Sequence, residues 1–123
     1  MLLSVSCASV DEDLNALPER YYQLGLEPLV QVFDFEFQRF RDADKQSVIV
    51  RTRGREAYLL VFNKAGFSRN DSVYIDDRNL RPGLTRVCVT SMDEGICRRI
   101  DVIYQFEDKK QENEVVRFLR AND

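Results

Sequence analysis

The chain has 123 residues, 44% of them hydrophobic and 32% charged, which indicates one folded domain with its own core and argues against a disordered chain. The net charge of −3 argues against a strongly basic protein of the kind that binds nucleic acid through charge alone. Histidine is absent, which excludes serine–histidine and cysteine–histidine catalysis and histidine-ligated metals; no cofactor or metal site is expected.

The amino-terminal segment, residues 1–28, is predicted to be a lead-in or tether with a short helix, which Pro18 interrupts or restarts at Glu19. Residues 2–6 form an apolar run that is too short for a secretory signal and has no basic stretch before it. Cys7 ends this run in the setting of the acylated cysteine of a bacterial lipoprotein. Lipid attachment at Cys7 and a free thiol at the terminus are the two alternatives for this residue.

Residues 29–123 are predicted to form a single β-rich domain, because short apolar runs alternate with turn residues. Strands are expected over residues 29–40 with a bulge, 47–53, 57–62, 72–75, 84–90 and 96–106. Residues 42–45 have turn chemistry, and residues 57–62 are apolar on both faces, as in a central strand. One face of the last strand is expected to carry Ile96, Ile100, Val102, Tyr104 and Phe106.

The closing segment has the period of an amphipathic helix. Asp108 can cap a helix that runs to Arg120, and its apolar face is formed by Val115, Val116, Phe118 and Leu119. The expected fold is mainly β, of the α+β type: a single small antiparallel sheet or open barrel of about six strands with a C-terminal helix and a short helical N-terminal lead-in.

Cys88 and Cys97 bracket the tip of a predicted hairpin. If they face each other, Val87 lies opposite Arg98, Arg86 lies opposite Arg99, and both sulfurs are on the polar face. A disulfide there would close a loop of about ten residues and contribute roughly 2.5 to 3 kcal/mol in the chain-entropy model. The alternative is two unpaired cysteines; the disulfide is favoured, and it indicates an oxidising compartment such as the bacterial periplasm or cell envelope.

Carboxylate pairs are the remaining candidates for catalysis. They are Asp42 with Asp44, Asp76 with Asp77, and Asp93 with Glu94, and Asp71 stands alone. All of them lie among turn residues, where aspartate is favoured for local hydrogen bonds to the backbone. We therefore expect turns rather than acid–base chemistry, and no enzyme.

Arginines on alternate residues form the sharpest binding signal. Arg51, Arg53 and Arg55 are expected to project from one face of the second strand, close to Tyr58, where they could hold phosphates while the aromatic ring stacks on a base. A second basic spot is formed by Arg86 and Arg99. These five arginines are the candidate anion-binding face, although the acidic balance of the chain makes nucleic acid an unfavoured partner.

Residues 35–119 resemble a family of short, uncharacterised proteobacterial envelope proteins that are exported or lipid-anchored. The resemblance is carried by residues 40–44, residues 47–50, Tyr58-Leu59-Leu60 and Cys97-x-x-Ile100-x-x-Ile103-Tyr104. It implies export and a small β-rich domain, and it implies no activity. The leading prediction is a non-enzymatic envelope domain that binds another envelope component and is tethered to the membrane through Cys7; the alternative is a cytosolic module that binds RNA or another polyanion.

Overall fold

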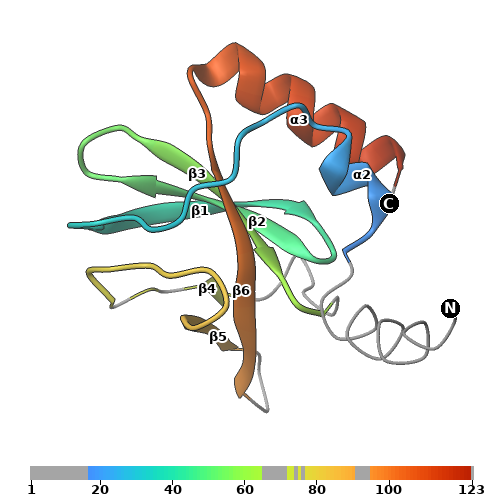
Figure 1. Ribbon diagram of the computed structural model, residues 1–123. Helices are drawn as coiled ribbons and strands as arrows, with labels where there is room; N and C mark the ends of the chain where they lie inside the picture. The colour runs from blue at the N-terminus through green and yellow to red at the C-terminus, as the bar shows by residue number, and fades with distance from the viewer. Residues whose placement is uncertain (1–16, 65–71, 74, 76, 91–94, 123) are drawn as a thin grey trace, which may run out of the picture.

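The computed structural model describes residues 17–64, 72–73, 75, 77–90 and 95–122. The elements, in chain order, are α2 (Glu19–Tyr22), β1 (Phe37–Asp44), β2 (Ser47–Thr52), β3 (Ala57–Phe62), β4 (Ser72–Val73), β5 (Arg86–Thr90), β6 (Gly95–Gln105) and α3 (Lys109–Ala121). The strands form one antiparallel sheet in the order β1-β2-β3-β6-β5-β4 (Figure 1). The predicted mainly β fold with a C-terminal helix is confirmed, and neither described helix is long and apolar enough to span a membrane.

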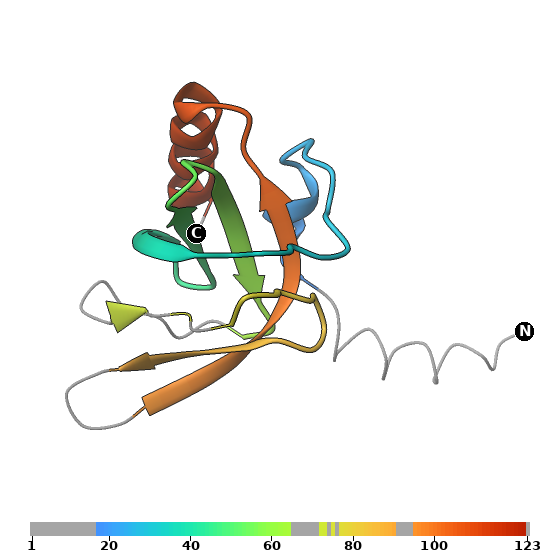
Figure 2. The same ribbon diagram turned by 90° about the vertical axis from the view of Figure 1, so that its left-hand side faces the viewer.

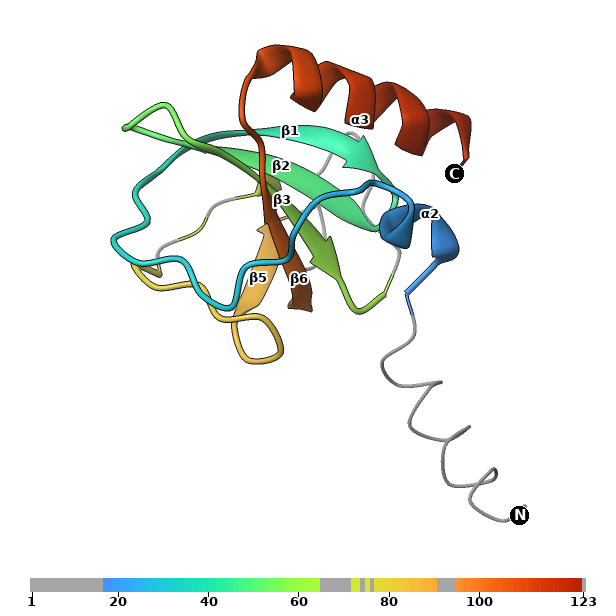
Figure 3. The ribbon, with the colours of Figure 1, turned by 45° about the horizontal axis from the view of Figure 1, so that its top comes forward.

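Apolar side chains cover both faces of the sheet. The face toward the helices, here called the helix-side core, includes Tyr21, Ile49, Leu59, Val61, Tyr104, Val115, Val116 and Leu119. The opposite face, here called the loop-side core, includes Val32, Phe35, Val48, Val50, Tyr58, Leu60, Ile100 and Ile103. Figure 2 shows the sheet between the helices on one side and the loops on the other. Figure 3 shows α3 lying along β1. The strand β3 is buried at every position, as its two-sided apolar pattern predicts.

The helix α3 begins where the sequence predicts. Asp108 has an extended backbone, and its Oδ1 accepts a hydrogen bond of 2.8 Å from the backbone N–H of Gln111, which satisfies one of the free donors of the first turn. Val115, Val116 and Leu119 then face the sheet. The position of α3 against β1 matters for function, because it places a row of polar side chains beside that strand.

The predicted first strand is wrong in its bounds. The strand β1 begins at Phe37 and continues to Asp44, through the residues expected to form a turn. Residues 29–35 instead cross the loop-side core, where Val32 forms a single bridge with Leu80, and the preceding Pro28 forms one with Tyr104 of β6. Asp34 has φ of 52°, which interrupts the extended backbone before β1 can begin.

The predicted single apolar face of β6 is also wrong. Val61 pairs with Val102, but Phe62 pairs with Ile100, so Asp101 is an extra residue that forms a bulge. Ile100 therefore joins Ile103 in the loop-side core, while Val102 contacts the helix-side core. A bulge exchanges the faces of all residues beyond it, which strict alternation could not anticipate.

Residues 17–28 of the lead-in are packed on the domain. The Tyr21 side chain is buried, and its hydroxyl donates to the Asp44 carboxylate at 2.7 Å. Arg20 Nε lies 3.1 Å from the same carboxylate, which also accepts hydrogen bonds from the N–H of Gln46 and the hydroxyl of Ser47. Asp44 thus joins α2 to the β1–β2 turn. Residues 1–16, which include Cys7 and the first part of the predicted tether, lie outside the described residues.

Candidate functional site

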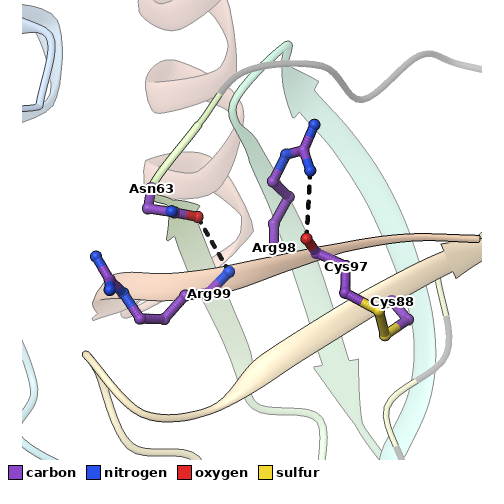
Figure 4. Close-up of a disulfide and its surroundings, with 5 residues drawn as sticks. All are labelled: Asn63, Cys88, Cys97, Arg98 and Arg99. Atoms are coloured by element: carbon purple, nitrogen blue, oxygen red, sulfur yellow. Dashed lines mark hydrogen bonds between the residues drawn. A yellow bond between two sulfur atoms is a disulfide. The ribbon is translucent and has the colours of Figure 1, made fainter. Parts of the chain in front are cut away.

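The β5–β6 hairpin has the predicted register. Cys88 pairs with Cys97, Val87 with Arg98 and Arg86 with Arg99. A disulfide joins the two cysteines, and both are exposed, on the polar face of the hairpin (Figure 4). Arg98 donates to the backbone oxygen of Cys97 at 3.3 Å. The cysteine pair is thus a covalent link across two strands near the edge of the sheet.

The five predicted arginines do not form one face. Arg86 and Arg99 lie on β5 and β6, which β3 separates from β2 in the sheet. Arg99 is neutralised by Asp101, with 2.9 Å between Nε and Oδ1, which offsets the repulsion from Arg86 on the opposite strand. Arg99 is thus paired within its own strand. The arginines at the other end of the sheet, on and next to β1 and β2, form the candidate site.

Arginines from β1 join those from β2 on the face toward α3. Arg39 lies directly opposite Arg51, and Arg41 lies opposite Ile49, whose side chain belongs to the helix-side core. Like charges directly opposite each other in a sheet are destabilising unless an anion lies near them. The structure supplies one such anion from the helix.

Glu112, in the first turn of α3, is a buried carboxylate held by three cations. Its Oε2 lies 2.8 Å from Arg41 Nη1 and 3.1 Å from Lys109 Nζ, and its Oε1 accepts a short hydrogen bond from Arg51 Nη2. Burial by itself raises the pKa of Glu112, but the hydrogen bonds from Lys109 and Arg41 and the charge of Arg51 outweigh it and hold the pKa below its ordinary value. Glu112 is therefore ionised and anchors α3 to β1 and β2.

Three adjoining hollows follow this cluster along β1 and α3. The first, of ≈ 520 Å³, is lined by Gln38, Arg39, Arg51, Arg53 and Arg55. The second, of ≈ 270 Å³, is lined by Arg39, Phe40, Arg41, Ile49, Arg51 and Lys109. The third, of ≈ 390 Å³, is lined by Arg41, Asn113, Val116, Arg117 and Arg120. Neighbouring hollows share arginines and therefore lie side by side; the three together are here called the basic groove.

The basic groove carries many more positive than negative charges. Its cations are Arg39, Arg41, Arg51, Arg53, Arg55, Lys109, Arg117 and Arg120. Glu112 neutralises part of the centre, and Arg120 donates to the backbone oxygens of Asp42 and Ala43 at the end of β1. Arg39, Arg53 and Arg55 make no ion pair with any described residue. The first hollow thus gathers three arginines that have no ionic partner among the described residues.

The predicted neighbour Tyr58 does not belong to this groove. It pairs with Val50, its ring lies 6.3 Å from that of Phe35, and it is buried in the loop-side core on the opposite face of the sheet. Its hydroxyl donates to Glu56 at 3.2 Å, and burial together with that carboxylate raises its pKa to about 12. The predicted stacking of bases on Tyr58 is therefore wrong.

Several groove residues were missed by the sequence analysis. Arg39 and Arg41 alternate as Arg51 and Arg53 do, but the predicted first strand ended at residue 40, which placed Arg39 at its end and Arg41 between it and the predicted turn. Glu112 was missed because only the packing of α3 on the sheet buries it beside arginines 61 and 71 residues away.

Comparisons of the chain with protein-family models, with curated proteins and with solved structures found no match. The basic groove and the disulfide are thus the structural features that bear on the function of the chain.

Proposed function

We propose that this chain is a non-enzymatic, extracytoplasmic domain that binds an anionic component of the cell envelope through the basic groove. The observation that carries the proposal is the gathering of Arg39, Arg53 and Arg55 around one hollow without an ionic partner among the described residues. Guanidinium groups present planar forks of donors that fit carboxylate and phosphate oxygens, and unpaired arginines held side by side favour an anion between them.

The distribution of charge supports the same function. The whole chain is acidic, with a net charge of −3, yet eight cations line the groove and one buried carboxylate lies among them. A concave surface of one sign attracts a partner of the opposite sign and accelerates the encounter. The acidic remainder of the surface repels anions, so binding would be directed to the groove.

The disulfide supports the proposed compartment. Cys88 and Cys97 are exposed and bonded, and such bonds persist in the periplasm and outside the cell but are reduced in the cytosol. Lipid attachment at Cys7 would add a membrane tether and stays a proposal, as does export itself. The compartment is checked by intact-mass measurement of the natural protein after alkylation without reductant; alkylation of both Cys88 and Cys97 would contradict an oxidising location.

Binding is tested with two polyanions, long-chain polyglutamate and inorganic polyphosphate, at low and at physiological ionic strength. We expect binding that weakens with salt and that the variant R39E/R53E/R55E loses. The matched control, K64E/R81E/R86E, changes the net charge equally at exposed residues outside the groove and should keep the binding. Equal binding by both variants, or no binding of either polyanion, would contradict the proposal.

The alternative is a cytosolic module that binds RNA. Its sequence basis was an arginine face beside an aromatic ring, and Tyr58 lies on the opposite side of the sheet. The groove would then hold the phosphates without stacking the bases. A reduced Cys88–Cys97 pair in the natural protein together with tight binding of oligoribonucleotides would favour this alternative.

A further inference from the structure

Glu112 shows how arginines from β1 and β2 bind a carboxylate in the basic groove. Arg41 on β1 contacts one carboxylate oxygen, and Arg51 on β2 contacts the other. The two arginines are diagonal neighbours, because Arg51 lies opposite Arg39, two residues before Arg41. One arginine from each strand therefore closes on one carboxylate.

A second pair of arginines lies next to the first, two residues further along each segment. Arg39 precedes Arg41 by two residues on β1, and Arg53 follows Arg51 by two residues, in the turn directly after β2. A bulge at Gln38 shifts the register there, but the backbone N–H of Arg53 still bonds to Glu36 O at 3.2 Å and keeps the segment beside β1. Arg39 and Arg53 both line the first hollow, with Arg55 and Gln38 beside them.

We propose that Arg39 and Arg53 form a second carboxylate clamp, and that it takes an acidic side chain from an extended segment of a partner protein. The proposal rests on the proposed function and names the ligand of the groove. A carboxylate is favoured because the neighbouring arginines, Arg41 and Arg51, already hold one, from Glu112. The partner is favoured to be a peptide because Glu112 separates the arginines at the two ends of the groove, and one extended chain can carry acidic side chains to both ends.

The rest of the groove supplies room for such a segment. From Lys109 to Arg120 the helix α3 runs for about 16 Å beside β1, with Asn113 and Arg117 lining the depression between them. The centre is already occupied by Glu112, so a bound segment would place its acids at the two ends, near Arg39 and Arg53 and near Arg117. No aromatic side chain of the described residues lines the first hollow. This disfavours a nucleic acid whose bases would stack on the protein.

The test measures binding of fluorescein-labelled hexaglutamate to the full oxidised chain by anisotropy, at low ionic strength. We expect R39Q/R53Q to weaken binding about tenfold or more, and the matched control K64Q/R81Q, with the same change in charge, to stay within about twofold of the parent chain. Unlabelled free glutamate at an equal carboxylate concentration should compete poorly, because it engages one clamp at a time. Oligothymidylate with the same number of charges is the second probe.

The outcomes separate this inference from the function on which it rests. If oligothymidylate binds more tightly than hexaglutamate and R39Q/R53Q weakens it, the groove binds anions but its ligand is a phosphodiester, and only the inference fails. If free glutamate competes as well as the peptide, the clamp takes a small molecule and the peptide partner is overturned. If R39Q/R53Q and K64Q/R81Q bind alike, the clamp does not exist, and if neither probe binds, both proposals fail.

Discussion

Replacement of Glu112 by glutamine tests whether the buried carboxylate holds the groove together. The substitution keeps the size of the side chain but removes its charge, and it puts an amide donor beside Arg41 or Arg51, which are donors themselves. Removing one partner of a buried ion pair costs about 3 to 5 kcal/mol when the other charge stays buried. Here Arg41 and Lys109 are 37% and 59% exposed and can be rehydrated, so we expect a loss of about 2 to 3 kcal/mol.

The assay is urea unfolding at neutral pH, with Glu114→Gln as the matched control because Glu114 is exposed on the same helix. The lowered pKa of Glu112 means that its contribution is present above its ordinary value of 4.5 and is lost as the pH falls through the lower value of the folded protein. The difference between the parent chain and E112Q should therefore shrink in acid. A loss below about 0.5 kcal/mol at neutral pH, or a difference that does not shrink, would refute the account of Glu112 as an ionised anchor.

Three further predictions concern the disulfide, the contact of α2 with Asp44 and the bulge in β6. The variant C88S/C97S should lose about 2.5 to 3 kcal/mol of unfolding free energy, measured against the oxidised chain in urea, and an unchanged midpoint would contradict a constraint on the unfolded state. Tyr21→Phe removes a hydroxyl that donates to the buried Asp44 and should cost about 1 to 2 kcal/mol in the same assay, unless α2 contributes nothing to stability. Deletion of Asp101 should destabilise the chain more than Asp101→Ala does in thermal unfolding, because deletion removes the bulge and turns buried residues to the wrong face; equal effects would show that the bulge is dispensable.

Local patterns were sufficient for the elements whose neighbours impose no irregularity. The strand β3 is apolar on both faces and is buried on both, and α3 starts at its Asp108 cap. The register of the β5–β6 hairpin followed from pairing Cys88 with Cys97. In each case one short-range constraint, a period, a cap or a cross-strand bond, determines the backbone, so sequence reasoning was enough.

The irregular strands required the tertiary structure. The strand β1 runs on to Asp44, whose carboxylate accepts hydrogen bonds from Gln46 and Ser47 around the turn and from Tyr21 and Arg20 of α2. In β6, the bulge at Asp101 sends Ile100 to the loop-side core. The hydrogen bonds from α2 to Asp44 and the pairing of Phe62 with Ile100 join residues distant in sequence, which the pattern along one strand does not reveal.

The sequence by itself therefore determined the class of fold, the cysteine pairing and a row of arginines, of which Arg51 lies on β2 and Arg53 and Arg55 lie in the turn after it. Only the tertiary structure decided what those arginines do, because the packing of α3 against β1 sets Glu112 between Arg41 and Arg51 and leaves Arg39 and Arg53 open. Arginine side chains on a strand carry the same charge in every fold. Whether that charge is neutralised or available for a partner depends on which carboxylates the folded chain brings within hydrogen-bonding distance.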